Sequence, residues 1–261
     1  MVSRIGKAGN QVVVKVPDSA GSAGNLRLEK ATVRGKSLDD LRKFLLRRLH
    51  AFGWKDKYPI LVGVWDENVT CSPSAQIWVP HVQDGPPVVE GIFEQRVRDS
   101  MAVFVGAARS TLPQALQGRL GDEASHIARI FQRLGYFGRC SLDAVIFCTA
   151  DGADEIHWIE CNGRWGGVSI PMTVAGALFA NQPAPAISIV QELRPGRQMQ
   201  TQEILRRLGD LLFCASDDME GIVLMSPPED DNGARINLLS LSQTQISSDE
   251  ILKEAMRRVL D

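Results

Sequence analysis

The 261-residue sequence lacks the features that assign a chain at once to the nucleic-acid-binding, membrane or secreted classes. It carries almost no excess charge, with 29 Lys and Arg against 31 Asp and Glu, whereas binding to nucleic acid or to a membrane surface usually needs a basic field. Its apolar runs are too short to span a bilayer. The first residues, MVSRIGK, do not form the apolar stretch of a signal peptide. We therefore expect no nucleic-acid partner and no membrane partner.

Cysteines are few and are not arranged in a recognisable pattern. The five cysteines form no CxxC pair, so the spacing indicates neither a zinc site nor a disulfide framework. A reduced, cytoplasmic setting is the expectation. The remaining composition, with 44% hydrophobic and 23% charged residues, is typical of a globular protein that buries a sizeable core.

Hydrophobic patterning predicts an alternation of strands and helices. A helix is expected after Ser37, which has the side chain of an N-cap. The run at 59–65 predicts a buried strand. Boundaries between subdomains are expected near 183–185 and 194–200. The other predicted strands are 11–16, 26–33, 74–80, 88–97, 101–108, 141–148, 156–161, 221–225 and 235–241, and the other helices are 121–134, 171–179, 200–212 and 248–260.

A lysine directly precedes a loop of small residues. Lys15 ends the first predicted strand, and residues 18–25 read DSAGSAGN. A lysine at this place can neutralise the phosphates of a nucleotide, and small residues let backbone N–H groups approach the phosphate oxygens. A surface hairpin with a solvated lysine would have the same pattern. It is not a Walker A motif, in which the lysine follows the loop.

Two later segments contain side chains with oxygen atoms. Asp143 lies within one apolar strand and Glu160 ends another, where a carboxylate is costly to bury unless it is paired or bound to a metal. Asn162 shares a strand face with Glu160. These three side chains suit magnesium, and Arg164 can reach a terminal phosphate. The alternative is that Glu160 and Arg164 form a local ion pair while Asp143 caps a turn.

Three other features of the middle of the chain have two interpretations each. Arg139 either binds a substrate carboxylate or is a solvated loop charge. Glu90 and Glu94 are predicted to share one strand face, directed either to a nucleotide or to solvent. Trp165, beside a Gly-Gly pair, either lines a substrate pocket or packs in the structure.

Taken in their order along the chain, the motifs in these segments resemble those of the ATP-grasp superfamily over residues 11–178. The VVK strand at 13–15 with its loop resembles the family's phosphate-holding strand and loop. The GYFG run that leads to Asp143 resembles its G-x-x-G … D strand, and IECNGR at 159–164 resembles its E-x-N-x-R metal signature. The resemblance implies an α+β fold of two subdomains, each with a mainly antiparallel sheet and packed helices, that grip ATP between them.

The resemblance also implies a division of the chain. Residues 1–65 would form a small lid-like subdomain with the phosphate-loop hairpin, and residues 66–180 the catalytic subdomain. Residues 181–261 would be an α/β extension that completes the catalytic subdomain. The family usually has a further N-terminal domain and a lysine-bearing strand before the phosphate loop. We therefore expect that the chain is a fragment, that it pairs with a second polypeptide, or that it is a reduced variant.

The roles implied for single residues follow from the matched motifs. Lys15 would hold ATP phosphates, and the backbone near Val64 and Trp65 would meet adenine. Asp66 or Glu67 would take the ribose. Arg164, together with Lys15, would be catalytic and steady the transferred phosphoryl group. The loop residues implied in phosphate binding are Ser19, Gly21, Ser22 and Gly24, and those implied in binding Mg²⁺ or Mn²⁺ are Asp143, Glu160 and Asn162.

The implied reaction is an ATP-dependent ligation. A carboxylate is activated as an acyl phosphate, which an amine, or less often a thiol, then attacks. The implied partners are ATP with a small carboxylate and an amine, or a peptide. Two other functions use the same residues: a non-catalytic ATP-binding module or partner subunit of a split ligase, and a transferase that passes the phosphoryl group to a hydroxyl.

Overall fold

The fold is given by a computed structural model, in which the chain divides into two compact units. The first unit comprises Met1–Val69 and Val97–Phe104, and the second comprises Thr70–Arg96 and Val105–Asp261. None of the helices in the described part of the chain has the length and apolar character needed to span a membrane. The structure describes residues 1–7, 10–16, 24–51, 53–56, 59–98, 103–149, 152–180, 183–215 and 219–260.

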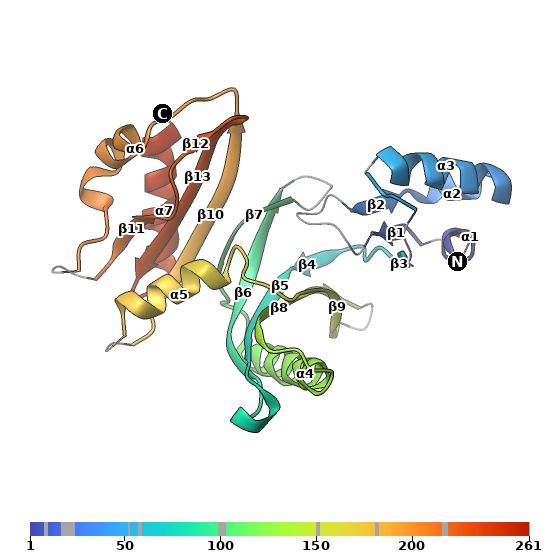
Figure 1. The fold of residues 1–261 in the computed structure, drawn as a ribbon, viewed down its shortest axis with the longest axis horizontal. Helices are drawn as coiled ribbons and strands as arrows, with labels where there is room; N and C mark the ends of the chain where they lie inside the picture. Colours follow the sequence, from blue (N-terminus) through green and yellow to red (C-terminus); the bar gives the residue numbers. More distant parts are fainter. Residues whose placement is uncertain are drawn as a thin grey trace. The chain divides into compact units, whose positions relative to one another are not determined.

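The first unit is a three-stranded antiparallel sheet with short helices, visible at the blue end of Figure 1. Its strands, in the order β2-β1-β3, are β2 (Asn25–Leu28), β1 (Val12–Lys15) and β3 (Leu61–Val64). Its helices are α1 (Val2–Lys7), α2 (Lys30–Arg34) and α3 (Leu38–Ala51). The core of this unit is formed by apolar residues from one face of the sheet and from one side of α3. It includes Val12, Val14, Leu26, Leu28, Leu41, Leu49 and Trp54.

Two of the predicted strands in the first unit are corrected by the structure. The strand predicted over 26–33 ends at Leu28, and α2 follows. The strand predicted as buried over 59–65 is the short β3, in which Leu61 is 55% and Val64 47% exposed. β3 is an edge strand of a small sheet, so it is not covered on both sides as the apolar run suggested. The predicted cap is confirmed, since the Asp40 N–H donates to the Ser37 hydroxyl at 3.1 Å.

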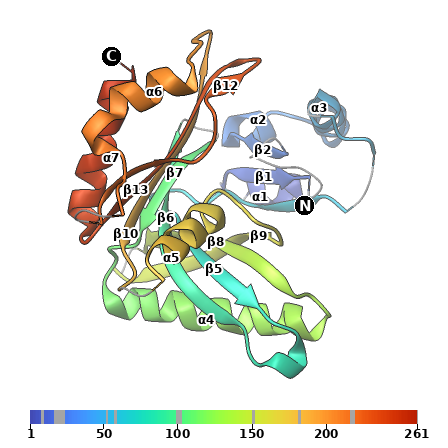
Figure 2. The ribbon, with the colours of Figure 1, turned by 60° about the vertical axis from the view of Figure 1, so that its left-hand side comes forward.

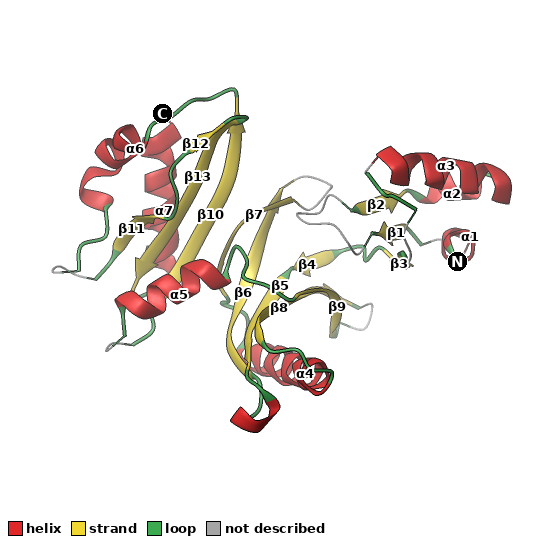
Figure 3. Cartoon of the chain, viewed as in Figure 1, coloured by secondary structure: helices red, strands yellow, loops and turns green. Residues whose placement is uncertain are grey.

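The second unit is built on a ten-stranded sheet in the order β11-β13-β10-β7-β6-β5-β8-β4, with β12 beside β13 and β9 beside β8. The strand pairs whose register is described are antiparallel. Figure 3 shows the helices that accompany these strands. The strands are β4 (Val69–Cys71), β5 (Pro73–Val79), β6 (Val88–Arg98), β7 (Val103–Arg109), β8 (Gly138–Cys148), β9 (Asp154–Asn162), β10 (Ala186–Pro195), β11 (Gly221–Leu224), β12 (Glu229–Asp230) and β13 (Gly233–Ser242).

Helices cover two regions of this large sheet. The long helix α4 (Gln114–Arg133) lies along β5 and β8 in Figure 2, and its apolar stripe joins their buried residues in one core. Helices α6 (Thr201–Leu208) and α7 (Gln245–Leu260) form a second core with β10, β11 and β13. Helix α5 (Ser169–Leu178) follows β9, and short 3-10 helices occur at Val82–Asp84 and Gly209–Leu211. The mixed helix and strand content with antiparallel sheets confirms the predicted α+β class.

Candidate functional site

The side chains of β5 and β8 alternate between two different environments. Ala75 and Ile77 of β5, with Leu142 and Ala144 of β8, are buried in the core that α4 covers. The residues between them therefore point to the opposite face. That face, called here the polar face, carries Ser74, Gln76, Arg139, Ser141 and Asp143, and the neighbouring strand β9 adds Glu160 and Asn162 in register.

The three predicted metal ligands lie together on the polar face. Asp143 is directly opposite Glu160, and Asn162 is directly opposite Ser141, in the antiparallel pair β8–β9. Residues directly opposite each other in such a pair have neighbouring side chains. The amide Nδ2 of Asn162 donates to Oδ2 of Asp143 at 3.1 Å. The structure thus brings the Asp143 carboxylate next to the Glu160 carboxylate and the Asn162 amide, which lie 17 and 19 residues further along the chain.

A buried polar chain holds the Asp143 carboxylate from the side of β5. The Ser74 hydroxyl donates to Oδ1 of Asp143 at 2.6 Å, and Nε2 of Gln76 donates to the Ser74 oxygen at 2.9 Å. Ser74 and Gln76 are 2% and 3% exposed. A buried hydroxyl and amide need partners, and here they fix the orientation of the carboxylate. Neither Ser74 nor Gln76 was predicted from the sequence, although two polar residues that alternate with apolar ones in a buried strand are a usable signal.

Arg164 lies at the exposed rim of the same cluster. Its Nη2 donates to Oδ1 of Asn162 at 3.3 Å, and its Nη1 donates to the Trp165 carbonyl at 3.2 Å. Arg164 therefore contacts a predicted ligand and not Glu160, so the local ion pair considered as the alternative is not the arrangement that the structure describes. The side chain is exposed, as expected of a group that meets a ligand.

The turn before Arg164 depends on a glycine. A Cβ at Gly163 would lie 3.2 Å from the ring of Tyr136, closer than most Cβ contacts. The Tyr136 hydroxyl donates to the Arg139 carbonyl, which keeps the ring in place. Burial raises the pKa of this hydroxyl above its usual value. Further along, the Gly166 N–H donates to the Ser169 hydroxyl at 2.8 Å, and the loop is thereby joined to α5.

The donor set fits a hard divalent cation of the magnesium type. Mg²⁺ is usually held by one or two carboxylates, with phosphate oxygens and water completing its shell, and Asp143 and Glu160 supply two carboxylates. The described residues contain no group of three or more His, Cys, Asp and Glu side chains arranged to hold a metal.

Arg139 is enclosed by aromatic rings. Its guanidinium lies 5.6 Å from the ring centre of Trp78 and 5.2 Å from that of Trp165, and it forms an ion pair with Glu90. The side chain is only 13% exposed, so of the two interpretations of Arg139 the solvated loop charge is wrong, and the contact with a substrate carboxylate stays a prediction. Burial lowers the pKa of this guanidinium below its usual value. Trp165 contacts Arg139 and is itself 49% exposed.

A bulge in β6 explains why Glu90 reaches Arg139. The register with β5 shifts between Gln76, which faces Gly91, and Ile77, which faces Val89. Glu90 is the extra residue, and a bulge of this kind redirects its side chain. The sequence-based expectation that Glu90 and Glu94 share a face is therefore wrong. Glu94 instead accepts hydrogen bonds from the Ser110 hydroxyl and the Thr111 N–H at the start of the segment that leads to α4.

The remaining predicted ligand residues belong to the first unit. Lys15 is the last residue of β1 and is paired in register with Asn25 and Leu61. The Val16 N–H donates to the Gly24 carbonyl at 2.9 Å, which closes the hairpin. The other predicted loop residues, Ser19, Gly21 and Ser22, lie outside the described residues.

The predicted adenine and ribose contacts have partners within the first unit. The Trp65 N–H donates to the Gln11 carbonyl at 3.0 Å, and the guanidinium of Arg27 lies 5.0 Å from the Trp65 ring centre. Glu67 forms a 3.1 Å ion pair with Lys30. A ribose hydroxyl at Glu67 would therefore compete with, or share, the contact to Lys30.

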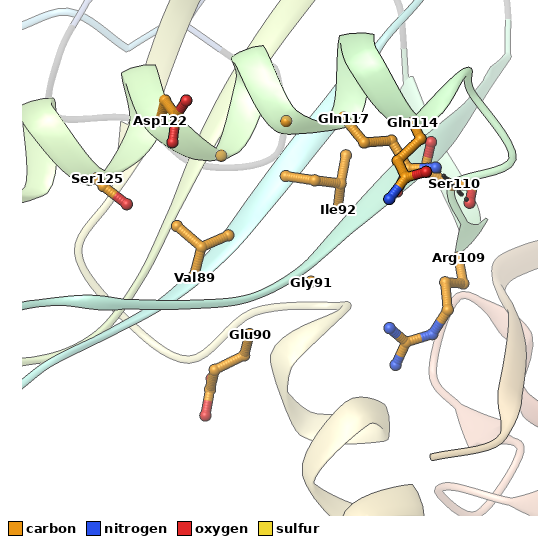
Figure 4. Close-up of a pocket in the computed structure, with 12 residues that line it drawn as sticks. Val89, Glu90, Gly91, Ile92, Arg109, Ser110, Gln114, Gln117, Asp122 and Ser125 are labelled. Atoms are coloured by element: carbon orange, nitrogen blue, oxygen red, sulfur yellow. Dashed lines mark hydrogen bonds between the residues drawn. The ribbon is translucent and has the colours of Figure 1, made fainter. Parts of the chain in front are cut away.

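A groove opens beside the N-terminal part of β6, next to the end of β7. β7 leaves β6 at Ser110, whose N–H donates to the Ile92 carbonyl at 2.9 Å. The groove has a volume of about 580 Å³, and the residues that line it come from β6, from the end of β7 and from one side of α4. In Figure 4, Glu90 and Arg109 point away from α4, while Val89 and Ile92 point toward it. None of the described residues that line the groove is a predicted metal ligand.

Comparison with solved structures identifies the fold. PurK, an N5-carboxyaminoimidazole ribonucleotide synthetase solved with ADP, matches with a TM-score of 0.60 and 16% identity over 96% of this chain and 62% of its own. The N5-carboxyaminoimidazole synthase of Aspergillus clavatus, in complex with ADP and 5-aminoimidazole ribonucleotide, matches with a TM-score of 0.64 and 13% identity over 99% of this chain and 64% of its own.

The biotin carboxylase domain of the Hydrogenobacter thermophilus 2-oxoglutarate carboxylase, with MgADP, ADP and bicarbonate, matches with a TM-score of 0.62 and 11% identity over 98% of this chain and 58% of its own. The sequence itself matches no protein-family model and no curated protein. PurK and biotin carboxylase are ATP-grasp enzymes, so the chain has an ATP-grasp fold, which confirms the predicted fold. The chain spans 58–64% of the length of these three structures.

Proposed function

We propose that this chain performs the chemistry of an ATP-dependent ligase, in which a carboxylate is activated as an acyl phosphate and then attacked by an amine. The observation that carries the proposal is the cluster of Asp143, Glu160, Asn162 and Arg164 on one face of an ATP-grasp sheet. Of the solved structures with this fold, one holds MgADP, ADP and bicarbonate, and another holds ADP and 5-aminoimidazole ribonucleotide.

The proposed metal ligands are Asp143, Glu160 and Asn162, for Mg²⁺ or Mn²⁺. A cation at this place would offset the negative charge that gathers on the transferred phosphoryl group. Ser74 keeps the Asp143 carboxylate in one orientation through its 2.6 Å hydrogen bond. Preorganised ligands of this kind lower the cost of reorganisation when the substrate binds.

Arg164 is proposed to bind the phosphoryl group directly. It is exposed, and its side chain is directed to the cluster by the hydrogen bond to Asn162. A guanidinium offers several donors in a plane and suits phosphate oxygens. Holding the phosphoryl group and the carboxylate in line removes much of the entropic barrier to the transfer.

The first unit is proposed to contribute Lys15 and the loop after it to the triphosphate. Ser19, Gly21, Ser22 and Gly24 are the proposed loop contacts. Val64 and Trp65 are the proposed contacts of adenine and Glu67 that of ribose. Residues 181–261 are proposed to complete the catalytic subdomain, and the unbroken strand order β13-β10-β7-β6 supports this, because it joins them to the sheet that carries Asp143.

The test is the substrate dependence of ADP release. The chain would be incubated with Mg-ATP and a panel of carboxylates and amines, singly and in pairs. The proposal predicts ADP release that requires one carboxylate and one amine together, and a loss of at least a hundredfold in Glu160→Gln. The matched control is Asp122→Asn, an exposed carboxylate on α4, which should keep the full rate. ADP release that requires only a hydroxyl compound would indicate a phosphoryl transferase, and binding without release a nucleotide-binding module.

A further inference from the structure

Arg109 is a cation without a counter-ion among the described residues. It ends β7, and its guanidinium lies 5.3 Å from the ring centre of Phe93, which is fully buried. Its Nε is buried and has no hydrogen-bond partner in the part of the chain that the structure describes. Burial also lowers the pKa of the guanidinium below its usual value. Arg109 is partly buried, and an Nε removed from water without a partner is costly, so an anion that pairs with this guanidinium would be bound favourably.

Arg139 provides the contrast on the same face. It is also buried, but Glu90 neutralises it and two tryptophan rings flank it. The contrast between the two arginines is therefore in the counter-ion: Arg139 has Glu90, whereas no ion pair of Arg109 is present among the described residues. The stability of the fold alone does not require an arginine at position 109. An apolar side chain packed on the Phe93 ring would avoid the cost of desolvating a guanidinium.

The space around Arg109 is kept open by a glycine. A Cβ at Gly91 would lie 3.1 Å from the Phe93 ring and 3.4 Å from Nη1 of Arg109. A larger side chain at Gly91 would fill the place over which the guanidinium lies. In Figure 4 the guanidinium of Arg109 points away from α4 and from the groove beside it. Because Arg109 is only partly buried, a ligand can reach the guanidinium from solvent on the polar face.

The register of the sheet gives the distance between this site and the proposed metal ligands. Gly91 faces Gln76, Gln76 faces Ser141, and Ser141 faces Asn162 across four neighbouring strands. Strands lie about 4.8 Å apart, so Gly91 and Asn162 are separated by about 14 Å. A small molecule can span that distance while its reacting group lies near the metal ligands.

We propose that Arg109 anchors an oxyanion group of the acceptor substrate, either a carboxylate or a phosphate monoester, at the end of the molecule remote from the reacting group. The assignment of a reacting end rests on the proposed ligase function, whereas the anion site itself does not. A planar guanidinium can accept either group through two parallel N–H···O bonds. Trp78 and Trp165, which are 42% and 49% exposed, flank Arg139 on the same face.

The test measures binding of simple anions by calorimetry. The probes are succinate, glycerol 3-phosphate and, as a neutral analogue, succinamide. The parent chain should bind one of the two anions with one-to-one stoichiometry and at least tenfold more tightly than succinamide, and the preferred anion distinguishes the carboxylate from the phosphate. Arg109→Gln should weaken that binding at least tenfold and Arg109→Lys by less. Arg129→Gln, at an exposed position of α4, should bind as the parent does.

A second readout separates this role from a structural one. Arg109→Gln should keep the urea midpoint of the parent or exceed it, because an unpaired buried charge does not stabilise the fold. A lower midpoint in both Arg109→Gln and Arg109→Lys would mean that the residue is structural and would overturn the proposal. Equal anion affinity in the parent and in Arg109→Gln, or no anion binding by the parent, would overturn it as well.

Parallel titrations with Mg-ATP distinguish this proposal from the ligase function. Arg109→Gln should bind Mg-ATP within threefold of the parent, and Asp143→Asn should keep the anion site while losing Mg-ATP. Anion binding that depends on Arg109 in a chain that does not bind Mg-ATP would support the site and reject the ligase function.

Discussion

The hydroxyl of Ser74 donates a 2.6 Å hydrogen bond to Oδ1 of Asp143 across the β5–β8 pair. Because Ser74 is 2% exposed, water does not replace this bond when it is lost. Ser74→Ala should therefore lower the free energy of unfolding by about 1–2 kcal/mol and weaken Mg-ATP binding severalfold, since Asp143 loses its orientation. Urea unfolding and calorimetry measure the two effects. Ser125→Ala on α4 is the control, and equal Mg-ATP affinity in both variants would contradict the positioning role.

Arg139 and Glu90 form a largely buried ion pair in which the side chains are 13% and 29% exposed. Arg139→Gln leaves the Glu90 carboxylate without its partner and should cost about 2 kcal/mol, less than a fully buried pair because both groups keep some contact with water. The double variant Arg139→Gln with Glu90→Gln should be less destabilised than Arg139→Gln alone. Urea unfolding of the parent, both single variants and the double variant gives this coupling. A coupling energy of zero would show that the pair has no energetic role.

Gly106 allows β7 to approach β10. A Cβ at this position would lie 2.1 Å from the Ile189 carbonyl oxygen, so Gly106→Ala should separate the two strands and lower the free energy of unfolding by about 3 kcal/mol. Gly118→Ala is the matched control, because a Cβ there meets open space in α4, and it should stabilise the chain by up to about 1 kcal/mol. Similar midpoints for the two variants in urea would contradict the description of the β7–β10 contact.

Glu254 accepts hydrogen bonds from Arg257 and Arg258 on α7, and these bonds lower the pKa of its carboxyl to about 2 from the ordinary 4.5. A carboxyl whose pKa is lower in the folded state stabilises the fold above pH 4.5, and this contribution is lost as the pH falls toward 2. Glu254→Gln should therefore be less stable than the parent at pH 7 and approach it at pH 2.5. Thermal midpoints at both pH values test this, and a difference that grows on acidification would have the wrong sign.

The local pattern of the sequence was sufficient to predict most of the elements that carry the site. The alternation around Asp143 and Glu160 predicted two strands, and the spacing of Glu160 and Asn162 predicted a shared face, because strand periodicity is local. The ATP-grasp fold was predicted from the motifs. The strand β10 was not predicted, since the prolines at 183 and 185 indicated a boundary and its long antiparallel pairing with β13 is not visible in local sequence.

The residues around the cluster depended on register, which a single sequence does not specify. The bulge at Glu90 directs this carboxylate to Arg139, and no local signal distinguishes it from regular alternation. Arg139 looked like a loop charge because its aromatic neighbours, Trp78 and Trp165, come from two distant segments. Ser74 was likewise not predicted, because its partner Asp143 lies 69 residues away.

The most direct test of the central claim is a calorimetric titration of Mg-ATP into three chains: the parent, Asp143→Asn and Asp122→Asn. Asp143→Asn keeps the size of the side chain and an oxygen for the Ser74 hydroxyl but removes the charge that a divalent cation needs. The account predicts that Asp143→Asn binds Mg-ATP at least tenfold more weakly than the parent, while Asp122→Asn binds as the parent does. Equal affinity in all three chains would contradict the assignment of the cluster on the polar face as the metal and nucleotide site.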